Sequence, residues 1–416
     1  MMKLVKYIGI GAIVLLSGCG NLDQPDNETV NGGEVVVDLD GQSIKKSLLQ
    51  SGISGVDNNT TVYGYKAYKI PYTTTDEQGD SVEASGLMVV PKGLPALVYT
   101  KLGLSMVSDD HGTIFANQES PTKLASLNNA PSGSSVILTS LFGFVTLQPD
   151  YIGFGDSNKH YHPFVLKKSL ANATVDFIKA AKQFALKNAI TLNGQLFLTG
   201  YSEGGYAALA TLQKIEKEEE MSVTMAAPMA GPYALTLMAK KVLSAPTLSV
   251  PSFMADVGYA YALTYDQDVA SVINEPYAST LEGLLDGSKV RTQIDAKLIK
   301  KTTGADGLFN PLFVQGFFTN PNHWFVKATE KNNLHNWVPK TAVRFMHCQG
   351  DEVIPYALST LTVKTMSAMG AKNIALLPVE KTMGLPKLLE HAECASVAYG
   401  VAGNIFAQTR KNTVGY

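Results

Sequence analysis

The sequence predicts an α/β fold in which a mostly parallel sheet is covered by helices on both faces. Apolar runs of strand length alternate with longer segments whose apolar residues recur at helical spacing, which is the pattern of parallel strands joined by crossover helices. One strand-to-helix junction carries Gly-Tyr-Ser-Glu-Gly at residues 200–204. Residues 231–339 interrupt the alternation, and this stretch is too long for a simple connection. These three features predict a sheet-and-helix core with one large helical insertion.

The elements expected before the junction begin with two segments that alternate polar and apolar residues, which indicates an antiparallel pair. The strands expected there are, in chain order, residues 61–71, 82–90, 96–100 and 143–148. The last of them leads into a glycine-rich turn at residues 149–155. A helix is expected at residues 169–186, where alanines and other apolar residues recur at helical spacing.

The elements expected from the junction onward complete the sheet around the insertion. The strands are residues 195–199, 222–226, 342–346 and 373–377, and the helices are residues 205–215, 356–369 and 388–407. The core is therefore expected at residues 61–232 and 341–416, with a helical cap at 233–340. The cap is rich in aromatic residues, which either line a substrate pocket or form the cap's own core: Tyr259, Tyr261, Tyr265, Phe309, Phe313, Phe317, Phe318 and Trp324.

Ser202 is the predicted nucleophile. A short apolar strand precedes the Gly-x-Ser-x-Gly sequence and a helix-like run follows it, so the serine would stand on a strained turn with its hydroxyl in a cleft. The helix N-terminus would place backbone N–H groups and positive potential beneath it. Glycines at both ends avoid collisions with the elements packed against the turn.

His391 is the predicted base, and chain order selects it from seven histidines. In folds that carry this turn, the order is serine, then acid, then histidine. That order removes His111, His160 and His162, while His323 and His335 fall inside the cap. His347 ends an expected strand, where the acid loop should begin. His391 remains, after the last expected strand.

The predicted acid is Asp351, with Glu352 as a solvated neighbour, because both follow a strand end in the sequence Gln-Gly-Asp-Glu at residues 349–352. An aspartate there would accept the Nδ1–H bond of the histidine and fix its tautomer. Cys348 and Cys394 each lie three residues from a predicted triad member. They are expected to form a disulfide if the acid and base touch, the alternative being two buried free thiols.

The predicted oxyanion hole uses two backbone N–H groups. One belongs to Glu203, directly after the nucleophile, and the other to Thr113 in the sequence His-Gly-Thr at residues 111–113. His111 is expected to brace this loop. Because the preceding strand is expected to end at Thr100, residues 101–110 would form an extra loop.

Five sequence motifs occur in one order along the chain: His-Gly-Thr at 111–113, Pro-Asp-Tyr-Ile-Gly-Phe-Gly at 149–155, Gly-Tyr-Ser-Glu-Gly-Gly at 200–205, Asn-x-x-x-Trp-x-Pro at 333–339 and Gly-Asp-Glu-Val-Ile-Pro at 350–355. Together they resemble the secretory lipase branch of the α/β-hydrolases, over roughly residues 60 to 410, cap included. The resemblance implies the α/β-hydrolase fold and carboxylic-ester hydrolysis without a metal or organic cofactor. In that pattern the His-Gly-Thr motif comes almost directly after its strand, so residues 101–110 are a departure that could reposition Thr113.

The N-terminal sequence predicts that the protein is located in a bacterial cell envelope. Lys3 and Lys6 precede a short apolar stretch that ends in Leu-Ser-Gly-Cys at residues 16–19. This looks like a lipoprotein signal peptide at residues 1–18 with Cys19 as the lipidated residue, and an ordinary secretory signal is the alternative. Residues 19–60 are assigned to a lipidated tether and an N-terminal segment, of which residues 20–34 suit a flexible tether. Gly20 after the cysteine favours the outer membrane if the envelope has two membranes.

Composition fits an extracytoplasmic enzyme. The 416 residues are 45% hydrophobic, enough for one large core, and the net charge of −2 argues against a nucleic-acid partner. The sequence therefore predicts a lipid-anchored, monomeric serine ester hydrolase acting on a small-molecule or lipid ester. A serine peptidase or aminopeptidase, an acyltransferase on the same triad, and a non-catalytic surface-binding protein are the alternatives.

Overall fold

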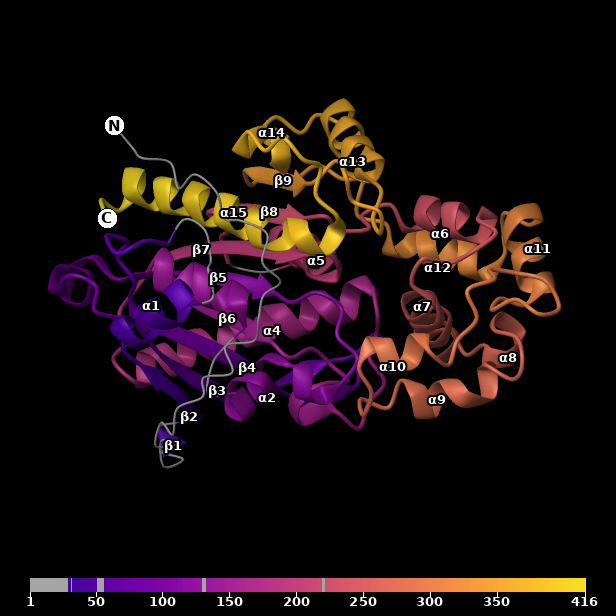
Figure 1. The fold of residues 1–416 in the computed structure, drawn as a ribbon, viewed down its shortest axis with the longest axis horizontal. Coiled ribbons are helices and arrows are strands. Elements are labelled where there is room, and N and C mark those ends of the chain that lie inside the picture. The colour runs from indigo at the N-terminus through magenta and orange to yellow at the C-terminus, as the bar shows by residue number, and fades with distance from the viewer. Residues whose placement is uncertain (1–28, 31, 51–55, 129–131, 219–220) are drawn as a thin grey trace.

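The computed structural model describes residues 29–30, 32–50, 56–128, 132–218 and 221–416 (Figure 1). The predicted lipoprotein signal peptide at residues 1–18 and Cys19 lie outside the described residues. Within them the chain forms one mixed sheet with strand order β1-β2-β3-β4-β6-β5-β7-β8-β9-β10. The predicted α/β fold is confirmed, because β6, β5, β7, β8, β9 and β10 run parallel while β1 to β4 form an antiparallel extension.

The strands are β1 Thr29–Val30, β2 Gly33–Leu39, β3 Gly64–Thr75, β4 Ser81–Lys92, β5 Leu104–Asp110, β6 Val145–Pro149, β7 Leu192–Tyr201, β8 Met225–Met229, β9 Val343–His347 and β10 Ile374–Pro378. The helices are α1 Gly41–Gln50, α2 Pro121–Asn128, α3 Gly133–Ser135, α4 Lys167–Lys187, α5 Glu203–Glu218, α6 Leu235–Ser244, α7 Pro251–Thr264, α8 Val269–Val272, α9 Leu281–Leu284, α10 Arg291–Asp295, α11 Pro311–Thr319, α12 Trp324–Asn332, α13 Tyr356–Ala368, α14 Val379–Met383 and α15 His391–Thr413.

Helices cover both faces of the parallel part of the sheet, and alternate strand residues supply each face. On β5, Met106 packs with the α4 and α5 side, whereas Val107 packs with the α15 side. On β7, Leu198 and Phe197 divide in the same way. Because successive side chains of a strand point to opposite faces, a strand buried on both faces carries no polar–apolar alternation that would mark it in the sequence.

The expected strand at residues 96–100 is wrong, and the true strand is β5, a few residues later. Val98–Leu102 forms a single wide helical turn, and Leu104–Asp110 pairs with β6 and β7 in the centre of the sheet. Because β5 contains Ser105, Ser108, Asp109 and Asp110, it does not read as a buried apolar strand in the sequence. Ser105 and Asp109 are satisfied by distant partners: Ser105 Oγ donates to the Gln195 side chain at 2.8 Å, and the Asp109 carboxylate accepts bonds from three side chains.

Residues 33–50, for which no helix or strand was predicted, form a strand of the sheet and a helix packed beside it. Strand β2 pairs antiparallel with β3, and helix α1 buries Ile44 and Leu48 in one apolar cluster with Val36 and Val37 of β2. Among the described residues, no helix has both the length and the apolar character required to cross a membrane.

Helices α6 to α12 lie between β8 and β9 in the chain and beyond one end of the sheet in space (Figure 1). The cap aromatics pack largely on one another. Phe313 contacts Phe309, Trp324 and Phe325 at ring-centroid distances of 6.1, 6.1 and 5.2 Å. Most of the cap aromatics therefore belong to the core, whereas Phe318 is exposed.

Candidate active site

Ser202 lies at a sharp turn between β7 and α5. Its φ of +61° is in the left-handed region, where a non-glycine residue is strained. The turn is held by the Ser202 N–H, which donates to the Met229 carbonyl at 2.9 Å. A Cβ on Gly204 would overlap the Asp110 carbonyl, and one on Gly205 would overlap that of Met229. The glycines are therefore required because the backbones of neighbouring strands pass directly against the helix start.

Asp351 and His391 meet where the loop after β9 faces the start of α15. The Nδ1 of His391 lies 2.6 Å from Oδ2 of Asp351, and since an ionised carboxylate only accepts, Nδ1 carries the proton. The other oxygen, Oδ1, accepts the N–H groups of Val353 and Ile354 at 3.0 and 2.7 Å. His391 is thereby fixed with Nε2 as its free nitrogen.

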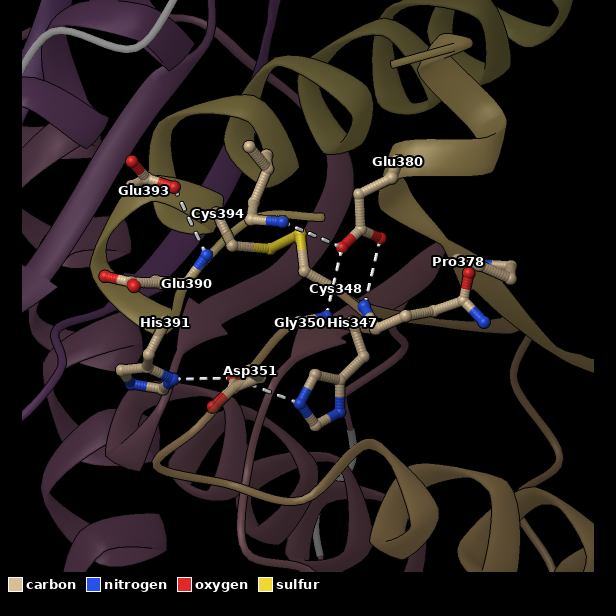
Figure 2. The surroundings of a disulfide bond; sticks show 12 residues. His347, Cys348, Gly350, Asp351, Pro378, Glu380, Glu390, His391, Glu393 and Cys394 are labelled. Atoms are coloured by element: carbon tan, nitrogen blue, oxygen red, sulfur yellow. Dashed lines mark hydrogen bonds and ion pairs between the residues drawn. A yellow bond between two sulfur atoms is a disulfide. The ribbon is translucent and has the colours of Figure 1, made fainter. Parts of the chain in front are cut away.

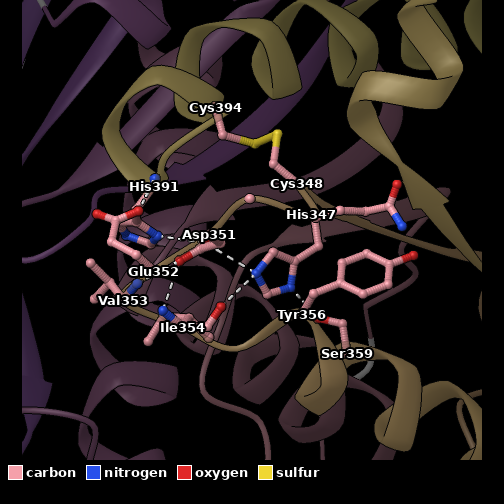
Figure 3. Close-up of polar contacts among 12 residues, drawn as sticks. His347, Cys348, Asp351, Glu352, Val353, Ile354, Tyr356, Ser359, His391 and Cys394 are labelled. Carbon is pink, nitrogen blue, oxygen red and sulfur yellow. Dashed lines mark hydrogen bonds and ion pairs between the residues drawn. A yellow bond between two sulfur atoms is a disulfide. The ribbon is translucent and has the colours of Figure 1, made fainter. Parts of the chain in front are cut away.

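The environment keeps Asp351 ionised. Burial alone would raise the pKa of this carboxyl, but hydrogen bonds from His347 and His391 outweigh burial and hold the pKa well below its usual range. His347 bonds to the same carboxylate from the side opposite His391 (Figure 3). His347 ends its strand, as predicted, whereas its contact with Asp351 was not predicted.

Three further ties join the loop that carries Asp351 to the segment that carries His391, and Figure 2 shows two of them, the disulfide and the Glu380 carboxylate. Cys348 and Cys394 form a disulfide with a Cα–Cα distance of 6.0 Å. The buried carboxylate of Glu380 accepts N–H groups from both sides, those of Gln349 and Gly350 and that of Leu389. Glu380 stands in a stretch with no recognisable motif, so no sequence signal could have identified it.

Glu352 supplies the third tie and is not merely a solvated neighbour of Asp351. Its carboxylate accepts the backbone N–H of His391 at 2.8 Å, which satisfies a free donor in the first turn of α15. The acid loop thus contacts the base residue twice, through the Asp351 side chain and through the Glu352 side chain.

Tyr201, the residue before the predicted nucleophile, contacts His391 as well. The Tyr201 hydroxyl donates to the His391 carbonyl at 2.8 Å, and the two rings lie 5.0 Å apart. Strand β7 therefore ends at Tyr201, whose side chain anchors the backbone of His391, and Ser202 follows directly on the turn.

The His-Gly-Thr sequence follows β5 directly, so the expectation of an extra loop at residues 101–110 is wrong. Those residues are largely β5 itself. The His111 ring lies within hydrogen-bond distance of the Gly112 and Asp150 carbonyls, at 2.8 and 3.2 Å, which braces the loop as expected. A Cβ on Gly112 would lie 3.0 Å from the Tyr201 carbonyl oxygen, so the loop packs closely against the end of β7.

The side chain of Glu203 points away from solvent to His162, with Oε1 2.7 Å from Nε2. The other nitrogen of His162 lies 2.9 Å from the Ile152 carbonyl, so it donates, and one proton is shared between His162 and Glu203. Burial would lower the pKa of His162, but the Glu203 carboxylate outweighs it and raises the pKa. Chain order excluded His162 as a base, and nothing in the sequence indicated its pairing with Glu203.

Ser202, Glu203 and Thr113 line one cavity of about 330 Å³. Its walls come from the cap helices α6 and α7, the segment between them and the acid loop, and are mainly apolar: Leu235, Met238, Val242, Leu248, Phe253, Met254, Val257, Val353 and Ile354. Of the cap aromatics named from the sequence, none belongs to this lining, and Phe253 of α7 takes that position instead. Within the described chain, no cluster of three or more His, Cys, Asp or Glu residues is placed to hold a metal ion.

Comparison with known proteins identifies the fold. A protein of Legionella pneumophila with a provisional hydrolase name superposes with a TM-score of 0.81, at 22% identity over 92% of this chain and 98% of that one. The rice cell wall degrading esterase LipA from Xanthomonas oryzae gives 0.74, at 22% identity over 94% and 98% of the two chains. Candida antarctica lipase A in its closed state gives 0.60, at 17% identity over 88% and 78%. The chain therefore has the α/β-hydrolase fold.

A sequence-family comparison adds one region. The model of the prolyl oligopeptidase family, Peptidase_S9, matches residues 132–227, which include the turn at Ser202. No curated protein matches the chain at a significant level.

Proposed function

We propose that this protein is a serine carboxylic-ester hydrolase of the lipase or esterase kind. The observation that supports this most is the combination of two features: an Asp351–His391 pair in hydrogen-bond contact, and a serine on a strained strand-to-helix turn that lines an apolar cavity. An apolar cavity next to a nucleophile suits the acyl part of an ester. The esterase and lipase among the structural neighbours agree with this class.

In the proposed reaction, Ser202 Oγ attacks the ester carbonyl while Nε2 of His391 takes the hydroxyl proton. The backbone N–H groups of Glu203 and Thr113 hold the oxyanion, and Asp351 stabilises the imidazolium. His391 then gives the proton to the departing alcohol, leaving an acyl-enzyme. A water molecule attacks the acyl carbon, loses its proton to His391, and the carboxylic acid leaves as Ser202 regains its hydrogen.

A serine peptidase is the second candidate, because the prolyl oligopeptidase model matches the segment around Ser202. The same residues would serve, with an amine as leaving group in place of an alcohol. Turnover of p-nitrophenyl esters of increasing chain length, compared with aminoacyl anilides, separates the two. We expect ester turnover to dominate, and preferential anilide cleavage would replace the ester assignment by the peptidase one.

The nucleophile is tested by Ser202→Ala. Triad members act as a unit, so kcat should fall by about 10⁴-fold or more, while the melting temperature stays close to that of wild type. A fluorophosphonate probe should label wild type at Ser202 and leave the variant unlabelled. Undiminished labelling of the variant at another serine would contradict the assignment.

We further propose that the protein is anchored in a bacterial cell envelope through lipid on Cys19 and acts outside the cytoplasm. The support is the Leu-Ser-Gly-Cys sequence at residues 16–19 and its charged and apolar flanks. Mass spectrometry of protein extracted from cell envelopes should find a diacylglyceryl-modified Cys19 as the N-terminal residue. A free Cys19 thiol in that protein would exclude the anchor.

A further inference from the structure

One carboxylate oxygen of Asp351 accepts hydrogen bonds from two imidazole rings. Oδ2 lies 2.6 Å from Nδ1 of His391 and 3.1 Å from Nε2 of His347. With Val353 and Ile354 N–H groups on Oδ1, the carboxylate has four donors, which is about its full capacity. A triad aspartate needs only one histidine, so the second imidazole calls for a role.

The protonation state of His347 follows from its partners. Its Nε2 is also 3.0 Å from the Ile354 carbonyl, and because both neighbours of Nε2 are acceptors, this nitrogen carries a proton. Its Nδ1 lies 2.8 Å from Ser359 Oγ on α13, whose hydroxyl can donate to it (Figure 3). The neutral Nε2–H tautomer therefore satisfies every contact without a buried positive charge.

The position of His347 is rigid. It is the last residue of β9, its side chain is fully buried, and its ring packs edge-on against Tyr356 at 5.5 Å. His347 therefore reaches Asp351 from the sheet, whereas His391 reaches it from the first residue of α15. The donor from the sheet fixes the plane of the carboxylate independently of the helix.

We propose that His347 is a positioning residue for the acid, which holds Oδ2 of Asp351 in line with His391 Nδ1–H and makes that oxygen less basic. A hydrogen bond to an ionised carboxylate stabilises its charge. An aspartate with one donor fewer would attract the imidazolium of His391 more strongly, so His391 would hold its proton to higher pH. This inference rests on the proposed function, because it assigns His347 a part in the same triad.

Other ionisable groups face this pair and stay unchanged in the test. From the acid loop, Glu352 accepts the His391 N–H, and from α14 Glu380 accepts N–H groups on both sides of the disulfide. From β7, Tyr201 bonds the His391 carbonyl, and in the first turn of α15 Glu393 pairs with Lys387. Among the described residues, none of these groups contacts the ring nitrogens of His347. Replacing His347 therefore removes one hydrogen bond to the Asp351 carboxylate and leaves the contacts of these groups in place.

The test compares His347→Leu, which keeps bulk but loses the N–H, with His347→Gln, whose amide can donate from about the same place. The leucine variant should lose about 10- to 100-fold in kcat against p-nitrophenyl esters with KM little changed, since a misplaced acid costs about this much. The acid limb of kcat/KM against pH should move up by about 0.5 to 1 unit. The glutamine variant should recover to within about threefold of wild type, with the limb restored.

Ser359→Ala offers a milder variant should the leucine protein fail to fold, because it removes only the partner of Nδ1. It should move the acid limb in the same direction by a smaller amount. A lower melting temperature with an unmoved acid limb in all folded variants would overturn the proposal, since that is the signature of a purely structural role.

A readout without turnover separates this inference from the proposed function. In protein labelled with ¹⁵N-histidine, with signals assigned by comparison with His391→Ala, the ring titration of His391 should move to higher pH in His347→Leu and not in His347→Gln. An unmoved titration in His347→Leu overturns the inference even if esters are hydrolysed. Absence of Ser202-dependent turnover contradicts the proposed function, while the titration still decides the role of His347.

Discussion

The turn that carries Ser202 and the corner where Asp351 meets His391 are held in place by different means. At the turn, backbone sterics decide: Ser202 has a positive φ, and a Cβ at Gly204 or Gly205 would overlap neighbouring carbonyls. At the corner, side chains decide: the disulfide, Glu380 and Glu352 join two segments that are about 40 residues apart in the chain. The turn is a local solution, and the corner is assembled from distant parts.

The difference predicts how each region fails. A backbone clash cannot be relieved by a small movement, because protein interiors are close-packed. A substitution that creates such a clash at the turn should therefore prevent folding. Each tie at the corner is one of several, so the loss of one should leave a folded protein whose triad is less well aligned.

Gly204→Ala should have the largest effect and should break the turn. Its new Cβ would overlap the Asp110 carbonyl in the neighbouring strand, which we expect to abolish soluble, cooperatively folding protein. Gly283→Ala in α9 is the matched control, because its Cβ meets nothing within 4 Å and should leave the melting curve unchanged. Thermal unfolding monitored by circular dichroism makes the comparison, and a folded, active Gly204→Ala protein would contradict the steric account of the turn.

His391→Ala should come next and should affect mainly activity. Without the base, kcat should fall by about 10⁴-fold, as for Ser202→Ala. The fold should survive because the bonds from Glu352 and the Tyr201 hydroxyl go to the backbone of His391 and do not need its ring. His347→Ala should be much milder, and the exposed His160→Ala should match wild type in p-nitrophenyl ester assays. An active His391→Ala protein together with an inactive His347→Ala protein would show that the base is assigned wrongly.

These two regions also differ in how far the sequence predicts them. The six residues 200–205 contain the serine and the glycines that the turn needs, so local reasoning finds it. Chain order selected His391, and the position after a predicted strand end selected Asp351; the structure places the two in contact. Glu380 and His162 act on residues about 30 to 40 positions away, and no local pattern records such contacts. Strand β5 was missed for a related reason, because its polar side chains are paired only in the folded chain.

Loss of the disulfide should weaken the corner without removing it. The bond closes a loop with a sequence separation of 46 residues, which corresponds to roughly 3–4 kcal/mol of unfolding free energy in the chain-entropy model. Reduction, or the Cys348→Ala/Cys394→Ala double variant, should therefore lower the denaturant midpoint and reduce kcat before the fold is lost, since Glu380 and Glu352 still join the segments. Unchanged stability after verified reduction would show that the other ties are sufficient alone.

The smallest expected effect is a difference in pH dependence between the two regions. Near the turn, Asp256 of α7 is buried beside His162 and Glu203, and burial raises its pKa to about 7. A carboxyl whose folded pKa is raised binds more protons when folded, so its contribution to stability is complete below about pH 4 and is lost as pH rises toward 7. At the corner, the lowered pKa of Asp351 has the opposite sign, and its contribution is lost only as pH falls below about 4.

Asp256→Asn separates these contributions. An asparagine cannot ionise, so the variant should gain about 1–2 kcal/mol relative to wild type between pH 5 and pH 8, which is less than the full pKa difference implies because buried sites relax. The acid-side loss of stability, set by Asp351, should be the same in both proteins. Asp80→Asn, at an exposed position, is the control and should follow wild type at every pH. Urea unfolding at a series of pH values measures all three. If Asp256→Asn runs parallel to wild type from pH 5 to pH 8, the carboxyl is ionised throughout that range, and its burial within the cap does not oppose ionisation.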